Sequence, residues 1–193
     1  MTVPNDAAIR WLLEGDPVVT WQTQRDLLGC ATAEYTATRR LIAREGWGAR
    51  LLAERAPDGT WGGGLYTPKW IPTFYTLQLL SHLGLPEDQG EAIESCRLLL
   101  DRGVDGSGDV CLWDSGGADT CVAAMLVSMA HAFGLGRDGR IPRVVARLLA
   151  EQMRDGGWNC QGRRKGADHS SGSARITVGL GRQLGVAAAG MRR

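Results

Sequence analysis

The residues that could do chemistry in this chain of 193 amino acids gather in two short stretches. The first, "ADTC" (118–121), holds Asp119 and Cys121, and the second, "CQGRRKGADH" (160–169), ends on His169. A carboxylate, a thiol and an imidazole are groups that enzymes use as acids and bases. A plainer interpretation stays open, in which Cys121 is a small buried apolar residue, Asp119 caps a helix and His169 lies in a loop.

The second stretch also carries three adjacent basic residues, Arg163, Arg164 and Lys165. Beside a helix N-terminus and an apolar pocket, such a run could hold a diphosphate, because backbone N–H groups and guanidinium groups both favour anions. A basic run in a glycine-containing loop is more often only a solvated surface. Arg163 and Arg164 are therefore candidate substrate-binding residues, with the surface loop as the alternative.

Aromatic residues form a third group, in which seven tryptophans stand against two phenylalanines. The set comprises Trp61, Tyr66, Trp70, Phe74, Tyr75, Trp113 and Trp158. Trp70, Phe74 and Tyr75 lead into a helical stretch, and with Trp113 they could line a cavity for an apolar ligand or a cation. The positions of Trp61 and Trp158 follow a turn dipeptide, so we expect these two rings to pack between helices.

An internal repeat positions these residues. Three blocks share a glycine-rich or polar loop with a tryptophan, a mostly apolar segment and a Leu-Gly or Phe-Gly stop. The blocks span residues 58–86, 108–136 and 155–185. Aligned on Trp61, Trp113 and Trp158, they are spaced by 52 and 45 residues, which is the size of a helical hairpin.

The hydrophobic pattern predicts two kinds of helix in this repeat. Residues 140–153 carry one apolar stripe with a solvated back, whereas residues 120–134 are apolar almost all round and should be buried on most sides. Shorter helices are expected earlier, at residues 7–15, 17–29, 33–46 and 47–54. No convincing strand is found, so the predicted fold class is all-α.

The buried helices should begin at good N-cap residues, near Thr73, Asp119 and Ser170 or Ser171. Each glycine-rich loop then leads into the N-terminus of a buried helix. We expect these N-termini to lie side by side, with the aromatic side chains and the positive ends of the helix dipoles at one end of the assembly.

Composition limits the classes of partner and the cellular compartment that the sequence predicts. The net charge is +1 with 22% charged residues, which predicts no nucleic-acid partner and no membrane-surface charge pattern. No secretory signal is recognisable at the N-terminus, and no apolar run is long enough to span a bilayer. The five cysteines are scattered and odd in number, as expected for reduced thiols in a cytoplasmic protein.

Two stretches carry a resemblance to a known superfamily. "LLAERAPDGTWGGG" (51–64) and "LLAEQMRDGGWN" (148–159) resemble the repeats of squalene–hopene cyclases, of other terpene cyclases and of protein prenyltransferase β-subunits. The resemblance is best over residues 46–171. It implies an α/α toroid, in which inner helices surround an apolar cavity for an isoprenoid substrate and outer helices cover them.

The chain has room for about four to four and a half of the six hairpins of a full toroid, at about 45–50 residues each. The resemblance therefore implies an incomplete α/α toroid, organised as a single domain over residues 1–193. Its parts are N-terminal helices (1–45), the best-matching repeats (46–171) and a degenerate C-terminal helix and tail (172–193). A homodimer or a partner chain could cover the open edge of such a ring.

The resemblance also implies a metal site. Prenyltransferase β-subunits hold a catalytic zinc with an Asp-x-Cys at one inner-helix start and a histidine at the next, which carries over to Asp119, Cys121 and His169. Three protein ligands leave a zinc position open for a substrate thiolate, and Cys160 could join or replace one of them. The Asp-x-Asp-Asp acid of squalene–hopene cyclases has no counterpart here.

Three functions follow from these observations as expectations. The first is an enzyme of isoprenoid chemistry, performing zinc-assisted prenyl transfer or terpene cyclisation. The second is a non-catalytic module that binds an apolar ligand on the same fold. The third is a protein-interaction module whose incomplete ring pairs with a second chain.

Overall fold

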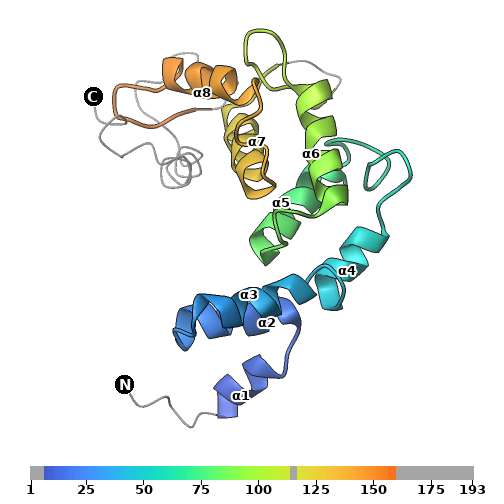
Figure 1. Ribbon diagram of the computed structural model, residues 1–193. Coiled ribbons are helices and arrows are strands. Elements are labelled where there is room, and N and C mark those ends of the chain that lie inside the picture. Colours follow the sequence, from blue (N-terminus) through green and yellow to red (C-terminus); the bar gives the residue numbers. More distant parts are fainter. Residues whose placement is uncertain (1–6, 114–116, 160–193) are drawn as a thin grey trace.

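The computed structural model of the chain describes residues 7–113 and 117–159 (Figure 1). Its elements are α1 (Ala7–Leu13), α2 (Pro17–Gln22), the π-helical segment η1 (Thr23–Leu27), α3 (Thr32–Leu41), α4 (Gly46–Ala53), α5 (Thr73–Leu83), α6 (Gly90–Gly103), α7 (Thr120–Ala132) and α8 (Ile141–Ala150). Among the described residues there are isolated β-bridges but no strand. The predicted all-α fold class is confirmed. No helix in this part of the chain has the length and apolar character needed to cross a membrane.

One carboxylate links α2 to α4, and one indole links α2 to α5. Asp16 caps α2 by accepting the Val18 N–H at 2.9 Å, and its second oxygen accepts the Trp47 N–H at 2.7 Å at the start of α4. The buried Trp21 donates its indole N–H to the Leu83 carbonyl at 2.9 Å. This last bond joins the N-terminal helices to the C-terminal end of α5.

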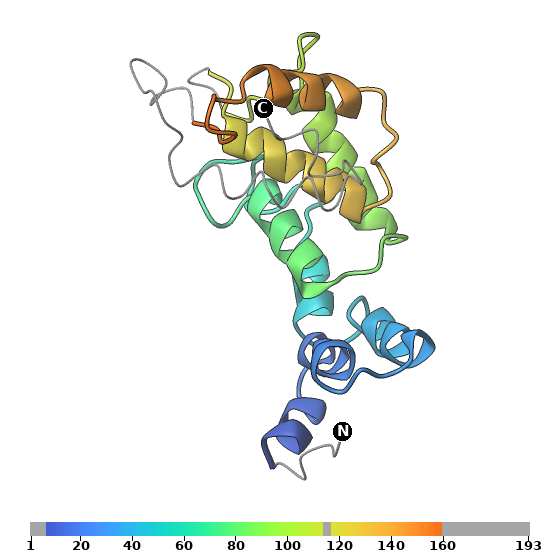
Figure 2. The ribbon, with the colours of Figure 1, turned by 90° about the vertical axis from the view of Figure 1, so that its left-hand side faces the viewer.

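The helices of the repeat pack in sequence order. α5 contacts α6 and α7, and α7 also contacts α6 and α8. In Figure 2, α5 and α7 begin at the same side of the molecule and run side by side. The loops that precede these two helices are therefore brought to one place.

Burial in α7 and α8 agrees with the two predicted helix types. In α7 the buried residues are Thr120, Val122, Ala123, Ala124, Leu126, Val127, Met129 and Ala130, which cover most sides of the helix. In α8 a single stripe of Ile141, Val144 and Leu148 is buried, while Leu149 is exposed. The amphipathic pattern of α8 thus marks a helix covered on one face only.

Both α5 and the segment after α7 end at a glycine in the left-handed conformation. Gly84 has φ +88° and Gly134 has φ +71°. The N–H of Leu85 then donates to the Leu80 carbonyl at 3.0 Å, and the equivalent bond after the second glycine is 2.7 Å. These are Schellman-type ends, which explains the Leu-Gly and Phe-Gly stops in the sequence.

Candidate functional site

Two of the tryptophan loops have the same hydrogen-bond geometry. Trp61 donates its indole N–H to the Leu51 carbonyl at 2.6 Å, and Trp158 donates to the Leu148 carbonyl at 2.6 Å. Both rings are buried, and the turn glycine two residues before each has a positive φ, +85° and +81°. Both tryptophans are buried against the helix that precedes their turn, in line with the packing role that their spacing from the turns predicts.

The middle loop has the same turn but a different residue in the packing position. Gly108 has φ +88°, and its N–H donates to the Asp105 carbonyl at 3.2 Å. The equivalent turn hydrogen bond in the first loop, from the Gly59 N–H to the Ala56 carbonyl, is 2.9 Å. Two residues after this glycine stands the buried Val110, where the first loop has Trp61. The alignment on Trp113 is therefore wrong, and the true spacings are 49 and 48 residues.

Trp113 instead joins a group of rings that we call the aromatic cluster, formed by Tyr66, Trp70, Phe74, Tyr75 and Trp113. The ring centre of Tyr66 lies 5.0 Å from that of Trp113, 5.1 Å from that of Tyr75 and 5.4 Å from that of Phe74. Trp70 extends the group, at 5.1 Å from Tyr75. The structure thus brings together the four aromatic residues that the sequence proposed as ligand-lining.

Exposure increases across the aromatic cluster. Phe74 is fully buried, Tyr66 and Tyr75 are half-buried, and Trp70 is 79% exposed. Trp70 also has φ +81°, a conformation that costs a non-glycine residue about 1–3 kcal/mol. The loop before α5 therefore holds a large aromatic ring in water at the expense of backbone strain, next to the exposed Ile71.

Asp119 occupies the N-cap position of α7, but its side chain makes no capping hydrogen bond. One of its carboxylate oxygens is buried and has no hydrogen-bond partner among the described residues. A buried acceptor without a partner costs about 1–3 kcal/mol. Asp119 is thus the N-cap residue of α7, as the sequence predicts, but its side chain makes no capping bond.

Asp119 and Cys121 lie close enough to the aromatic cluster to affect the ionisation of Tyr66. Burial raises the pKa of the Tyr66 hydroxyl well above its usual range, a hydrogen bond with Tyr75 raises it further, and the charges of Cys121 and Asp119 add to the effect. Two of the three predicted chemical residues are therefore neighbours of the aromatic cluster, and Tyr66 stays neutral there.

The loop that carries Trp158 also reaches the start of α7. The Thr120 hydroxyl, between Asp119 and Cys121 in the sequence, donates to the carbonyl of Asn159 at 3.0 Å. The loops that precede α5 and α7 and the described end of the Trp158 loop thus meet near the start of α7.

Several predicted site residues, His169, Arg163, Arg164 and Cys160, lie outside the described residues. Within 7–113 and 117–159, no three or more His, Cys, Asp or Glu side chains are grouped as a metal site would require. Asp119 and Cys121 offer two donors of the types zinc accepts, and the orphaned Asp119 oxygen fits a ligand role. The zinc site stays a prediction that depends on the third donor.

Tyr66 was one of the aromatic residues noted in the sequence, but nothing there marked it as the centre of the cluster. It lies in the irregular loop "GGGLYTPKW", where no helical or strand periodicity indicates which way a side chain points. Its central position results from the packing of α5 against α7, which brings Trp113 onto its ring.

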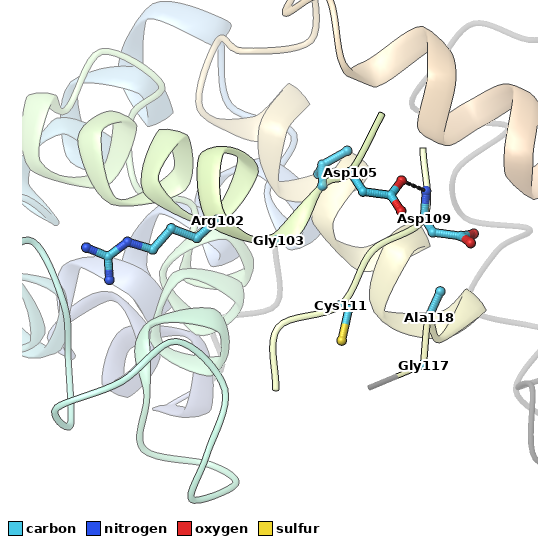
Figure 3. Close-up of a pocket in the computed structure, with 8 residues that line it drawn as sticks. Arg102, Gly103, Asp105, Asp109, Cys111, Gly117 and Ala118 are labelled. Carbon is cyan, nitrogen blue, oxygen red and sulfur yellow. Dashed lines mark hydrogen bonds between the residues drawn. The ribbon is translucent and has the colours of Figure 1, made fainter. Parts of the chain in front are cut away.

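A separate pocket of about 400 Å³ lies beside the middle loop (Figure 3). Its carboxylates are already used: Asp105 accepts from the N–H and hydroxyl of Ser107 and from the Asp109 N–H, and Asp109 pairs with Arg147 at 2.6 Å. In the close-up, the Arg102 guanidinium points away from both carboxylates. These residues stabilise the loop and its contact with α8, and the aromatic cluster is the better candidate site.

Comparison of the chain with protein-family models, with curated proteins and with solved structures finds no match.

Proposed function

We propose that the aromatic cluster forms one wall of a binding site for an apolar, isoprenoid-type ligand, on an α/α hairpin array that is an incomplete toroid. The observation that carries the proposal is the convergence of five aromatic rings, from two loops and α5, near Asp119. One carboxylate oxygen of Asp119 is buried without a hydrogen-bond partner among the described residues. Aromatic faces suit both unsaturated chains and carbocations. The parallel start of α5 and α7 supports the toroid arrangement.

The polar side of the proposed site is Asp119 and Cys121. If zinc binds there, these two side chains and His169 would hold it, and the ion would activate a substrate thiol or polarise a leaving group. Arg163 and Arg164 are proposed to hold the diphosphate of a prenyl diphosphate. The enzyme proposal therefore divides into an aromatic part, a metal part and a basic part that can be tested separately.

The aromatic part is tested by tryptophan fluorescence during titration with farnesyl diphosphate. Because Trp70 and Trp113 would contact the chain of the ligand, Trp113→Ala should raise the dissociation constant about tenfold, equivalent to about 1.4 kcal/mol. Leu149→Ala is the control, since Leu149 is an exposed apolar side chain on α8. Unchanged binding in Trp113→Ala and in Trp70→Ala would show that the ligand does not use the aromatic cluster.

The basic part is tested with two ligands of equal chain length. The double variant Arg163→Ala/Arg164→Ala should weaken farnesyl diphosphate and leave farnesol unchanged, because only the first carries the anion. If both ligands weaken equally, the arginines act through the fold and not on the diphosphate.

The metal part is tested by metal analysis of the purified protein. Zinc near one equivalent should fall sharply in Cys121→Ser and in Asp119→Asn, with Cys30→Ser in the N-terminal part as the control thiol. Zinc-free protein that nevertheless turns over a prenyl diphosphate would remove the zinc mechanism. Binding of the ligand without any turnover, in protein that carries zinc, would favour the non-catalytic binding module instead.

A further inference from the structure

An apolar groove of about 470 Å³ lies between α4 and α5, away from the aromatic cluster. It is lined by Trp47, Arg50, Leu51, Glu54, Leu79 and Leu83. Trp47 is 47% exposed and Leu79 is 45% exposed, so large apolar side chains face water on both walls. Such a surface is costly in a soluble fold unless another element covers it.

Helix α1 also exposes a large apolar side chain. Its sequence is "AAIRWLL", yet none of its residues is buried, and Trp11 is 72% exposed. The helix contacts α2 and η1, with Ile9, Leu12 and Leu13 half-buried and Trp11 exposed beside the small residues Ala7 and Ala8. The Trp11 ring, one helical turn after two alanines, is a protruding apolar knob of the kind that carries much of the binding energy of interfaces.

The charged residues near Trp11 and those along the groove are complementary when the two helices run antiparallel. Arg10 on α1 and Glu14 just after its end are four residues apart, and so are Arg50 on α4 and its C-cap residue Glu54. All four side chains are exposed, and none forms an ion pair within the described part of the chain. Antiparallel helices would place Arg10 beside Glu54 and Glu14 beside Arg50, whereas parallel helices would place like charges together.

We infer that α1 of a second copy of this chain lies antiparallel in the groove between α4 and α5, with Trp11 against Trp47, Leu79 and Leu83. In Figures 1 and 2, α2 and α3 lie between α1 and α5 of the same chain, so the occupant comes from another molecule. Reciprocal insertion of both α1 helices gives a closed two-fold pair. This dimer does not depend on the proposed ligand or on zinc.

The test is the oligomeric state of the full chain, measured by sedimentation velocity over a range of concentrations. We expect a dimer whose dissociation constant rises at least about tenfold in Trp11→Ala, because interface tryptophans carry a large share of the binding energy. Circular dichroism and urea unfolding of the variant check that the fold is intact. A monomer at every concentration overturns the inference, and so does a dimer that is unaffected by Trp11→Ala.

Charge reversal decides the orientation. Arg10→Glu alone and Glu54→Arg alone should each weaken the dimer, and the double variant should bring the dissociation constant back toward that of the wild type. Arg40→Glu, an equal change of charge at an exposed position on α3, is the control and should have little effect. If the double variant is as weak as the sum of the single variants, Arg10 and Glu54 do not meet and the antiparallel docking is overturned.

Discussion

Trp61 and Trp158 make the same hydrogen bond, from the indole N–H to a leucine carbonyl ten residues earlier, although 97 residues separate them in the sequence. In each case a helix, a turn with a left-handed glycine and a buried indole form one unit. The repeat is therefore one structural unit, and the loop that follows Trp61 carries Tyr66 and Trp70 of the aromatic cluster.

The buried tryptophans should dominate stability. We expect Trp61→Ala and Trp158→Ala each to lower the free energy of unfolding by about 3–5 kcal/mol, because each leaves a cavity and an unpaired carbonyl. Trp70→Ala, at a ring 79% exposed, should change it by less than about 0.5 kcal/mol. Urea unfolding followed by circular dichroism measures all three. Equal losses at buried and exposed tryptophans would contradict the packing described here.

The two helix-ending glycines offer a matched pair. Both Gly84→Ala and Gly134→Ala force a non-glycine residue into positive φ, which costs about 1–3 kcal/mol. At Gly84 an added methyl group would also overlap the indole of Trp21, whereas at Gly134 the nearest atom is 3.9 Å away. We expect Gly84→Ala to destabilise the protein by about 1–3 kcal/mol more than Gly134→Ala in urea unfolding. Similar losses would show that Trp21 moves aside freely.

Asp138 should make stability depend on acid pH. The Arg140 guanidinium, which donates to this carboxylate, lowers the pKa of Asp138 to about 2. Since the folded pKa is lowered, the stabilisation is present above about pH 4, the unfolded pKa, and is lost as the pH falls through the folded value near 2. Asp138→Asn should therefore cost about 1–2 kcal/mol at pH 7 and little at pH 2.

The measurement for Asp138 is the free energy of unfolding as a function of pH, for the wild type and the variant. Asp88→Asn, at an exposed carboxylate, is the control and should follow the wild-type curve. A constant difference between the wild type and Asp138→Asn across the whole pH range would mean that the side chain acts through hydrogen bonds alone.

Tyr66 should remain un-ionised where ordinary tyrosines titrate. Burial and its hydrogen bond with Tyr75 raise its pKa, so it should not contribute to the phenolate absorbance that forms near pH 10, about the usual tyrosine value. Difference spectra of the folded wild type and of folded Tyr66→Phe should therefore show the same absorbance step there. In urea, where Tyr66 is exposed, the absorbance step of the wild type should exceed that of Tyr66→Phe. A smaller step in folded Tyr66→Phe would place Tyr66 in water.

The local sequence pattern was sufficient to predict how helices α7 and α8 are buried. Helical periodicity predicted α7 as buried on most sides and α8 as buried on one stripe, and the turn dipeptides predicted where Trp61 and Trp158 pack. These features depend on neighbours within about ten residues, which a single sequence displays directly. The helix ends at Gly84 and Gly134 could be predicted from the sequence for the same reason.

The register of the middle repeat and the composition of the site were decided by tertiary structure. Val110 takes the tryptophan position because the turn is set by backbone closure and the left-handed Gly108, not by which apolar residue follows. Trp113 and Tyr66 meet because α5 packs against α7. Asp119 has a buried oxygen without a hydrogen-bond partner in the described part of the chain because its side chain does not cap the helix. Such contacts join residues about 50 positions apart, and their energies depend on a three-dimensional arrangement that no local pattern encodes.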